Sequence, residues 1–323
     1  MRSGWLTLPD GRIETGWWGP NPDDAPTIVL LHEGLGCVAL WRDVPERLAA
    51  ATGLGVFAYS RFGYGQSDPV SLPRPMTYMH HEGQVVLPQV LAAAGIRDAV
   101  LVGHSDGGSI AAIYAGITEG ERLEADAPFP HRHGRAWPDH PRLAVLAERK
   151  GVDGRPPPTT TEGAVKPPEG WSKVGHDGRT APRLHALVTI AAHFFVEDLN
   201  IASIRQIRNT YDTGELRPRL ARYHRDPDIA FHGWNGAWLD PRFRDFDITG
   251  FLPTIRVPTL GLQGADDPYG TAAQLEIMRT RMIAPVDTRL IGDARHTPHL
   301  EAKEATLDAI TGFISATIRQ HVP

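Results

Sequence analysis

The sequence predicts an α/β fold in which a mostly parallel central sheet is flanked by helices on both faces. Short, continuous apolar runs occur at residues 27–32, 55–60 and 99–103, and such runs are typical of strands that are buried on both faces. Segments with helical spacing alternate with these runs, which favours right-handed crossovers between parallel strands. Polar motifs follow several of the runs, and ligands of such sheets bind beyond the carboxyl ends of the strands.

The first half of the chain provides the predicted elements in a regular order. Residues 4–18 alternate around Pro9-Asp10-Gly11 and predict two antiparallel strands joined by a turn. The elements expected after them are strands at 27–32, 55–60 and 99–103 and helices at 41–51, 77–95 and 109–115. The last of these strands runs directly into a turn bounded by glycines.

The regular alternation stops in the middle of the chain, where residues 118–182 are rich in proline and glycine and predict an insertion. The fold resumes with a strand at 184–192, after which residues 194–250 have a helical pattern with many aromatic side chains, as expected of a helical cap. The remaining predicted elements are strands at 258–263 and 288–291 and helices at 271–282 and 302–318. We therefore expect a core of residues 1–117 and 251–323, with the strand at 184–193, to which the 118–182 insertion and the 194–250 cap are added.

The overall composition is that of a globular protein with one large core. The chain has 323 residues, of which 41% are hydrophobic and 22% charged, as is usual for soluble domains. Its formal net charge of -5 provides no basic surface for nucleic acid or an anionic membrane. We therefore expect a small-molecule substrate as the partner, and a monomer or a homodimer.

Cysteine usage and the N-terminus favour a cytoplasmic protein. Cys37 is the only cysteine, so no intrachain disulfide forms and a site built from several thiolates is excluded. The first residues lack a basic region followed by a long apolar run, and no stretch of about 18 apolar residues occurs. We expect neither a signal peptide nor a membrane span.

One serine stands on a tight turn between a strand and a helix, in Gly103-His104-Ser105-Asp106-Gly107. A serine hydroxyl attacks only where it projects from the backbone, beside a base and beside donors that bind the resulting oxyanion. The two glycines let the strand and the helix approach each other, and the Asp106 N–H lies at the helix start, where it can face the oxyanion. We predict that Ser105 is the nucleophile and that Asp106 supplies one oxyanion donor.

A histidine is expected as the base, because Ser105 needs a partner that titrates near neutrality. His296 follows the last strand and precedes the last helix, as a base on a loop must. His299 is expected to be already helical, with Thr297 and Pro298 starting that helix, and a buried structural role is favoured for it.

The carboxylate that orients the base is expected after an earlier strand. Two adjacent aspartates, Asp266 and Asp267, follow the strand at 258–263, and both qualify. Glu197 and Asp198, which follow the strand at 184–192, are the weaker alternative.

Together these segments resemble the α/β-hydrolase superfamily over residues 27–117 and 184–320, including the turn at 60–67. The nucleophile, acid and base come in the chain order of that superfamily, each on a loop after a strand. The segment Gly264-Ala265-Asp266-Asp267 resembles its Gly-x-x-Asp pattern, which selects Asp267 as the acid and leaves Asp266 as a turn residue. The resemblance implies an α/β-hydrolase fold with a helical cap and an extra insertion, and a Ser105–Asp267–His296 triad.

The loop at residues 32–36 resembles the oxyanion loop of the same superfamily, in which a histidine and a glycine usually precede the donor. The resemblance implies that the Gly34 N–H is the second oxyanion donor, with Leu35 as the alternative. Glu33 departs from the pattern, since it stands where a glycine is usual. It is expected to be either a solvated loop carboxylate or an inward charge that contacts substrate or a histidine.

The substrate pocket is expected to include side chains from these loops and from the cap, although His104 and the cap tryptophans qualify equally as packing residues. The candidates are Glu33, Leu35, His104, Phe194, Trp234 and Trp238. His131, His133, Asp139 and His140 lie in the proline-rich insertion without ordered spacing, which favours surface histidines over a metal site. No nucleotide-binding glycine motif follows a strand, so we expect neither a metal nor a cofactor.

Three functional hypotheses follow. The first is a serine hydrolase that cleaves a carboxylic ester, lactone or thioester through an acyl-enzyme. The second is a C–C bond hydrolase or a cofactor-free perhydrolase with the same triad, which fold analogy does not separate from the first. The third is an inactive, ligand-binding protein with the same fold. A serine instead of an aspartate at position 105 argues against the dehalogenase and epoxide-hydrolase branches.

Overall fold

An eight-stranded sheet forms the centre of the protein in the computed structural model, which describes residues 1–125, 182–214 and 216–319. The strand order is β1-β2-β4-β3-β5-β6-β7-β8. The hairpin of β1 and β2 is antiparallel and forms one edge, and the pairs from β4 to β8 are all parallel. The predicted α/β class with a mostly parallel sheet is confirmed.

The strands lie close to their expected positions. They are β1 (Arg2–Leu8), β2 (Gly11–Trp18), β3 (Thr27–Leu31), β4 (Gly55–Tyr59), β5 (Asp98–His104), β6 (Arg183–Ile190), β7 (Thr259–Gly264) and β8 (Val286–Ile291). Every residue of β3 and β4 is buried, as their continuous apolar sequences predict. The edge strand β8 is partly exposed.

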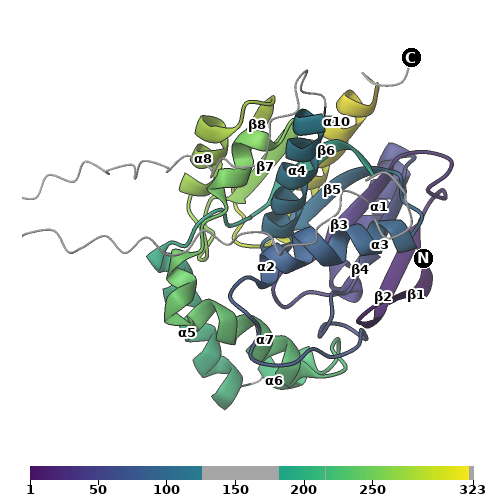
Figure 1. Cartoon of the computed structure of the whole chain (residues 1–323). Coiled ribbons are helices and arrows are strands. Elements are labelled where there is room, and N and C mark those ends of the chain that lie inside the picture. Colours follow the sequence, from purple (N-terminus) through teal and green to yellow (C-terminus); the bar gives the residue numbers. More distant parts are fainter. Residues whose placement is uncertain (126–181, 215, 320–323) are drawn as a thin grey trace, which may run out of the picture.

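The helices form two layers around the sheet and a third group at one end of it. They are α1 (Val44–Thr52), α2 (Tyr78–His81), α3 (Leu87–Ala93), α4 (Asp106–Ala125), α5 (Asp198–Thr213), α6 (Leu216–Leu220), α7 (Pro227–Leu239), α8 (Ala273–Arg281), α9 (Pro298–Glu301) and α10 (Lys303–Arg319). Helices α1 and α10 pack on one face, and α3, α4 and α8 pack on the other (Figure 1). Among the described residues, no helix has the length and apolarity needed to span a membrane.

Two elements differ from the expectations. The helical region at 77–95 is interrupted by a π-helical turn at Glu82–Val86, where Gly83 lies so close to α4 that an added Cβ would stand 2.9 Å from the Ile110 oxygen. Helix α4 continues to Ala125, past residue 118, where the insertion was expected to begin. Most of that insertion, with His131, His133, Asp139 and His140, lies outside the described residues, and the domain boundaries stay predictions.

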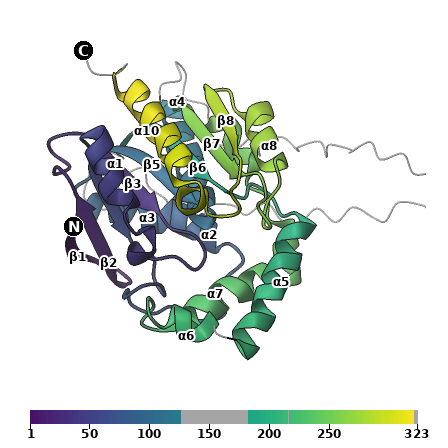
Figure 2. The same cartoon turned by 180° about the vertical axis from the view of Figure 1, so that it is seen from behind.

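The topology brings the polar loops together at the carboxyl ends of the parallel strands. Ser105 follows β5, His193 follows β6, Asp267 follows β7 and His296 follows β8, and all four strands are parallel. Helices α5, α6 and α7 lie together beyond that end of the sheet in both views (Figures 1 and 2). The fold therefore brings loops that are up to 191 residues apart in the chain to a common site beneath these helices.

Candidate active site

Ser105 occupies a strained turn between β5 and α4. Its φ of 52° is in the left-handed region, which residues other than glycine rarely adopt. Gly107 makes this turn sterically feasible, because a Cβ at that position would stand 2.1 Å from the Leu31 oxygen. The turn is held by hydrogen bonds from Ser105 N–H to the Ile190 oxygen (2.8 Å) and from Gly108 N–H to the Ser105 oxygen (2.8 Å). The backbone thus directs the hydroxyl away from the sheet.

His296 and Asp267 complete a hydrogen-bonded chain to that hydroxyl. His296 Nε2 lies 3.0 Å from Ser105 Oγ, and His296 Nδ1 lies 3.0 Å and 2.8 Å from the two carboxylate oxygens of Asp267. Asp267 also accepts hydrogen bonds from the Tyr269 N–H (2.7 Å) and from Gln263 Nε2 (2.6 Å). Burial raises the pKa of Asp267, but its hydrogen bonds to His296 and to the Tyr269 N–H outweigh burial and leave the pKa below its usual value.

The loop at residues 32–36 is fixed by a buried arginine that follows β4. The Arg61 side chain is 1% exposed; its guanidinium donates to the carbonyl oxygens of His32 (2.5 Å) and Glu33 (3.0 Å). The same guanidinium lies 3.9 Å from the Asp106 carboxylate, which also accepts hydrogen bonds from the Tyr78 hydroxyl (2.6 Å) and from Trp238 Nε1 (3.3 Å). Arg61 therefore links the two segments that carry the predicted oxyanion donors.

The two predicted oxyanion donors belong to the start of α4 and to the loop after β3. Asp106 is the first residue of α4, and the first N–H groups of a helix have no intrahelical acceptor. Gly34 lies in the middle of a turn closed by a hydrogen bond from Gly36 N–H to the Glu33 oxygen (3.1 Å). It packs against the indole of Trp234 so closely that a Cβ on Gly34 would stand 2.2 Å from the ring.

Glu33 points inward to a histidine, which is one of the two arrangements expected for it. Its carboxylate lies 3.3 Å from His104 Nδ1, and its side chain is 26% exposed. His104 Nε2 in turn donates to the His296 carbonyl oxygen (2.8 Å). Burial raises the pKa of Glu33, but the hydrogen bond and the charge of His104 reverse the effect and hold it well below its usual range.

A pocket of about 100 Å³ opens beside Ser105. It is lined by Glu33, Gly34, Leu35, Ser105, His193, Ile204, Trp234, Trp238, Tyr269 and His296. Of the six side chains expected there, Glu33, Leu35, Trp234 and Trp238 are present. His104 is not a lining residue because its ring is buried between Glu33 and the His296 loop, and Phe194 is not because it is 1% exposed and packs in the apolar core.

Sequence reasoning missed three lining residues, His193, Ile204 and Tyr269. His193 and Tyr269 each lie close in the sequence to a residue that the sequence predicts for the site. His193 precedes Phe194, and Tyr269 lies two positions after Asp267. The available signal was position, since both follow the carboxyl end of a parallel strand, where side chains reach the ligand. Ile204 comes from the middle of α5 and carries no such signal.

The alternative acid residues and His299 have structural contacts away from Ser105. Glu197 accepts hydrogen bonds from Thr271, and Asp198 forms an ion pair with Arg244 (2.8 Å). The His299 ring is 3% exposed and lies 4.6 Å from the His104 ring. Within the described residues, no group of three or more His, Cys, Asp or Glu side chains is placed to hold a metal ion.

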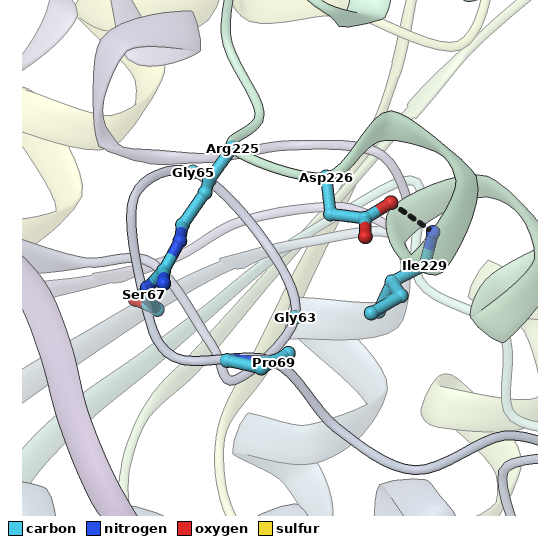
Figure 3. A pocket seen from close by; sticks show the side chains of 7 residues that line it. All are labelled: Gly63, Gly65, Ser67, Pro69, Arg225, Asp226 and Ile229. Carbon is cyan, nitrogen blue, oxygen red and sulfur yellow. Dashed lines mark hydrogen bonds between the residues drawn. The ribbon is translucent and has the colours of Figure 1, made fainter.

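A second hollow, of about 220 Å³, lies between the Gly63–Pro69 turn and the start of α7 (Figure 3). Its polar side chains have protein partners. Asp226 caps α7 by accepting from the Asp228 and Ile229 N–H groups (3.0 and 2.9 Å), and Ser67 Oγ donates to the Ser60 oxygen (2.6 Å). Arg225 is half-exposed and pairs with Asp68 (3.3 Å). Ser105 and His296 line the smaller pocket and are not among the residues that line this hollow.

Several histidines near this site are buried in the neutral form. Burial lowers the pKa of His32 and of His299 well below the usual value, and it lowers the pKa of His193 to about 3. A histidine with a depressed folded-state pKa binds a proton in the unfolded chain before it does so in the folded one. Between pH 6.5 and the folded-state pKa the unfolded state therefore holds more protons, and stability falls as the pH falls.

We expect the free energy of unfolding to decrease between pH 7.5 and pH 5, with each such histidine contributing up to about 1.4 kcal/mol per pH unit below about pH 6.5. Urea unfolding at several pH values measures this slope. His299→Gln should flatten the slope, whereas replacing the exposed His81 with glutamine should leave it unchanged. Equal slopes for the two variants would contradict the assignment of a buried, neutral His299.

Comparison with known proteins agrees with this architecture. A family model described as the alpha/beta hydrolase fold matches residues 26–123. The proline iminopeptidase of Mycobacterium smegmatis is 15% identical, with 99% of this chain and 100% of that chain covered and a TM-score of 0.63. A thermophilic esterase from Thermogutta terrifontis is 16% identical, with 98% and 99% covered and a TM-score of 0.61. The structure of VinJ is 18% identical, with 98% and 99% covered and a TM-score of 0.62.

The search of curated proteins gave no match. The shared topology and the family match over residues 26–123 show that the chain has the α/β-hydrolase fold. At these sequence identities the likeness to the solved structures shows the fold alone, because one fold hosts many activities.

Proposed function

We propose that this protein is a serine hydrolase that cleaves small carboxylic esters, lactones or thioesters through an acyl-enzyme. The observation that carries the proposal is the alignment of His296, with one ring nitrogen 3.0 Å from Ser105 Oγ and the other within 3.0 Å of both Asp267 oxygens. Asp267 accepts a hydrogen bond from the N–H at Nδ1, and the proton of the neutral ring is therefore on Nδ1. The Nε2 lone pair then faces the Ser105 hydroxyl and can take the hydroxyl proton.

Acylation begins when Ser105 Oγ attacks the carbonyl carbon and His296 Nε2 takes the hydroxyl proton. The carbonyl electron pair moves to oxygen, and the N–H groups of Gly34 and Asp106 donate hydrogen bonds to the oxyanion. Asp267 stabilises the imidazolium and keeps the ring oriented. When the tetrahedral intermediate collapses, the bond to the leaving oxygen or sulfur breaks and His296 returns the proton to it.

Deacylation repeats these steps with water as the nucleophile. His296 takes a proton from water, the hydroxide attacks the acyl carbon, and the same donors hold the oxyanion. The bond to Ser105 Oγ then breaks, the serine regains its proton from His296, and a carboxylic acid is released. No step calls for a metal or a cofactor.

The pocket favours substrates with short chains. Its volume of about 100 Å³ is smaller than a cavity of roughly 150 Å³ that accommodates benzene. Its walls beside Ser105 are largely apolar and closely packed, because Trp238 is almost fully buried and Trp234 packs against the oxyanion loop. A long acyl chain would not fit within this volume.

The proposal is tested with p-nitrophenyl esters of increasing acyl length, together with a fluorophosphonate that labels active serines. We expect kcat/KM to be highest for acetate to butyrate and to fall by about tenfold or more at octanoate, since overfilling a packed site costs about 1–3 kcal/mol. Mass spectrometry should place the label on Ser105 in the native protein and detect none after heat unfolding.

The other two hypotheses give different outcomes in the same experiment. Turnover of a vinylogous diketone without ester turnover would favour a C–C bond hydrolase. A folded protein that neither turns over esters nor labels at Ser105, but melts at a higher temperature with ligand, would be a binding protein. A maximum at octanoate or longer esters would contradict the inference from pocket size.

A further inference from the structure

His193 lies in the pocket but takes no part in the proposed mechanism. It follows β6, is 3% exposed, and lines the same pocket as Ser105. Its ring is stacked 5.8 Å from the His296 ring at an interplanar angle of 21°, and the edge of Trp238 packs against it at 5.2 Å. What this buried imidazole can bind depends on which of its two ring nitrogens carries the proton.

Asn200 fixes the tautomer of His193. The side-chain oxygen of Asn200 accepts the N–H of Glu197, so its amide nitrogen is directed to His193 Nδ1 (3.2 Å) and to the Tyr269 carbonyl oxygen. An amide nitrogen only donates, and therefore Nδ1 must present its lone pair. The proton of the neutral ring is then on Nε2.

The ring stays neutral under ordinary conditions. Burial and the neighbouring His296 and His104 lower the pKa of His193, while Asp267 raises it less, and the result is about 3. Within the described residues, the Nε2–H has no hydrogen-bond acceptor, whereas the Nδ1 lone pair accepts a hydrogen bond from the Asn200 amide. Nε2 is not among the fully buried side-chain atoms that lack a partner, and His193 lines the pocket, so this free donor is available to a ligand atom.

We propose that the Nε2–H of His193 binds an uncharged oxygen of the substrate, carried by the leaving group close to the scissile bond. The inference rests on the proposed function and extends it to a substrate class, namely esters of alcohols with a nearby ether, carbonyl or hydroxyl oxygen. The leaving group is assigned because His296 must reach its oxygen to return the proton, and His193 stacks on His296. An anionic group is disfavoured because the Glu33 carboxylate lines the same pocket.

The test compares two acetates that form the same acyl-enzyme, butyl acetate and 2-methoxyethyl acetate. They differ only in that an oxygen replaces one CH₂ group of the alcohol. The preference is defined as kcat/KM for 2-methoxyethyl acetate divided by kcat/KM for butyl acetate. It is compared between wild type and the His193 variants, so that the intrinsic reactivities of the two esters cancel. His193→Phe keeps a ring but has no donor, and we expect it to lower the preference for 2-methoxyethyl acetate about fivefold to tenfold. His193→Gln, which restores an N–H, should recover part of it.

A second measurement tests the proton placement independently of turnover. In protein labelled with ¹⁵N-histidine, the resonances that vanish in His193→Gln should be those of a neutral ring protonated at Nε2 throughout pH 5–8. Protonation at Nδ1, or titration within this range, would overturn the inference. So would an equal preference in wild type and His193→Phe.

The failure of this inference can be told apart from failure of the proposed function. If all three proteins hydrolyse both acetates with one common ratio and label at Ser105, the hydrolase stands and the His193 subsite is wrong. If wild type hydrolyses neither acetate and Ser105 does not label, both are wrong. The labelling rate of Ser105 also reports whether a His193 variant has kept an intact triad.

Discussion

Replacing Ser105 with alanine is expected to lower kcat for p-nitrophenyl acetate by about 10⁴-fold or more. The variant has no oxygen to attack the ester, and His296 then has no hydroxyl proton to take at the 3.0 Å contact. The residual rate should come from the oxyanion donors alone. Stopped assays over hours, with fluorophosphonate labelling in parallel, measure activity and covalent reaction on the same samples.

A matched variant controls for the loss of a hydroxyl near the site. Ser203 Oγ donates to the Pro268 oxygen (2.6 Å), close to the loop that carries Asp267, but Ser203 is not a lining residue of the pocket. Ser203→Ala should keep kcat within about threefold of wild type, because it removes a single partly exposed hydrogen bond. Activity within tenfold of wild type in Ser105→Ala would refute the acyl-enzyme mechanism.

The sequence predicts the fold and the three hydrogen-bonded residues because both depend on local patterns. A buried parallel strand appears as an uninterrupted apolar run, and the residue after it lies at the ligand-binding edge of the sheet. Ser105, Asp267 and His296 each occupy such a position. Their side chains meet because their strands belong to one sheet, and their order along the chain was visible before any contact was known.

Contacts between distant segments could not be predicted in this way. Arg61 occurs in a glycine-rich turn, where an arginine would ordinarily be exposed, and its burial depends on acceptors in the loop after β3. The inward direction of Glu33 depends on His104, which is 71 residues away. Charged side chains are rarely buried unless paired, and the partner of each is set by the three-dimensional packing of the loops.

The pocket was predicted in part for the same reason. Trp234 and Trp238 were recognised as aromatic residues of a helical segment, and α7 brings both to the pocket. Phe194 is among the candidates that the sequence suggests for the pocket, whereas its neighbour His193 lines the pocket instead. Which of two adjacent loop residues faces the ligand depends on backbone angles after β6 that no sequence pattern specifies.

Asp267→Asn is expected to lower kcat by about 10⁴-fold while the protein stays folded. Both oxygens of Asp267 accept hydrogen bonds, from His296 Nδ1, the Tyr269 N–H and Gln263 Nε2. An asparagine amide in place of either oxygen turns one acceptor into a donor. Where the amide nitrogen faces His296, the ring can bond to it only by presenting the Nδ1 lone pair. This places the ring proton on Nε2, facing Ser105, where the ring cannot act as a base.

The neighbouring Asp266 is the matched control, because it has the same side chain one position earlier but is exposed. Asp266→Asn should change kcat less than twofold. Measured at pH 7.5 with p-nitrophenyl acetate, the two variants separate the orienting role of Asp267 from a general effect of negative charge in this loop, since each removes one carboxylate. If Asp266→Asn were the inactive variant and Asp267→Asn the active one, the assignment of the acid would have to be reversed.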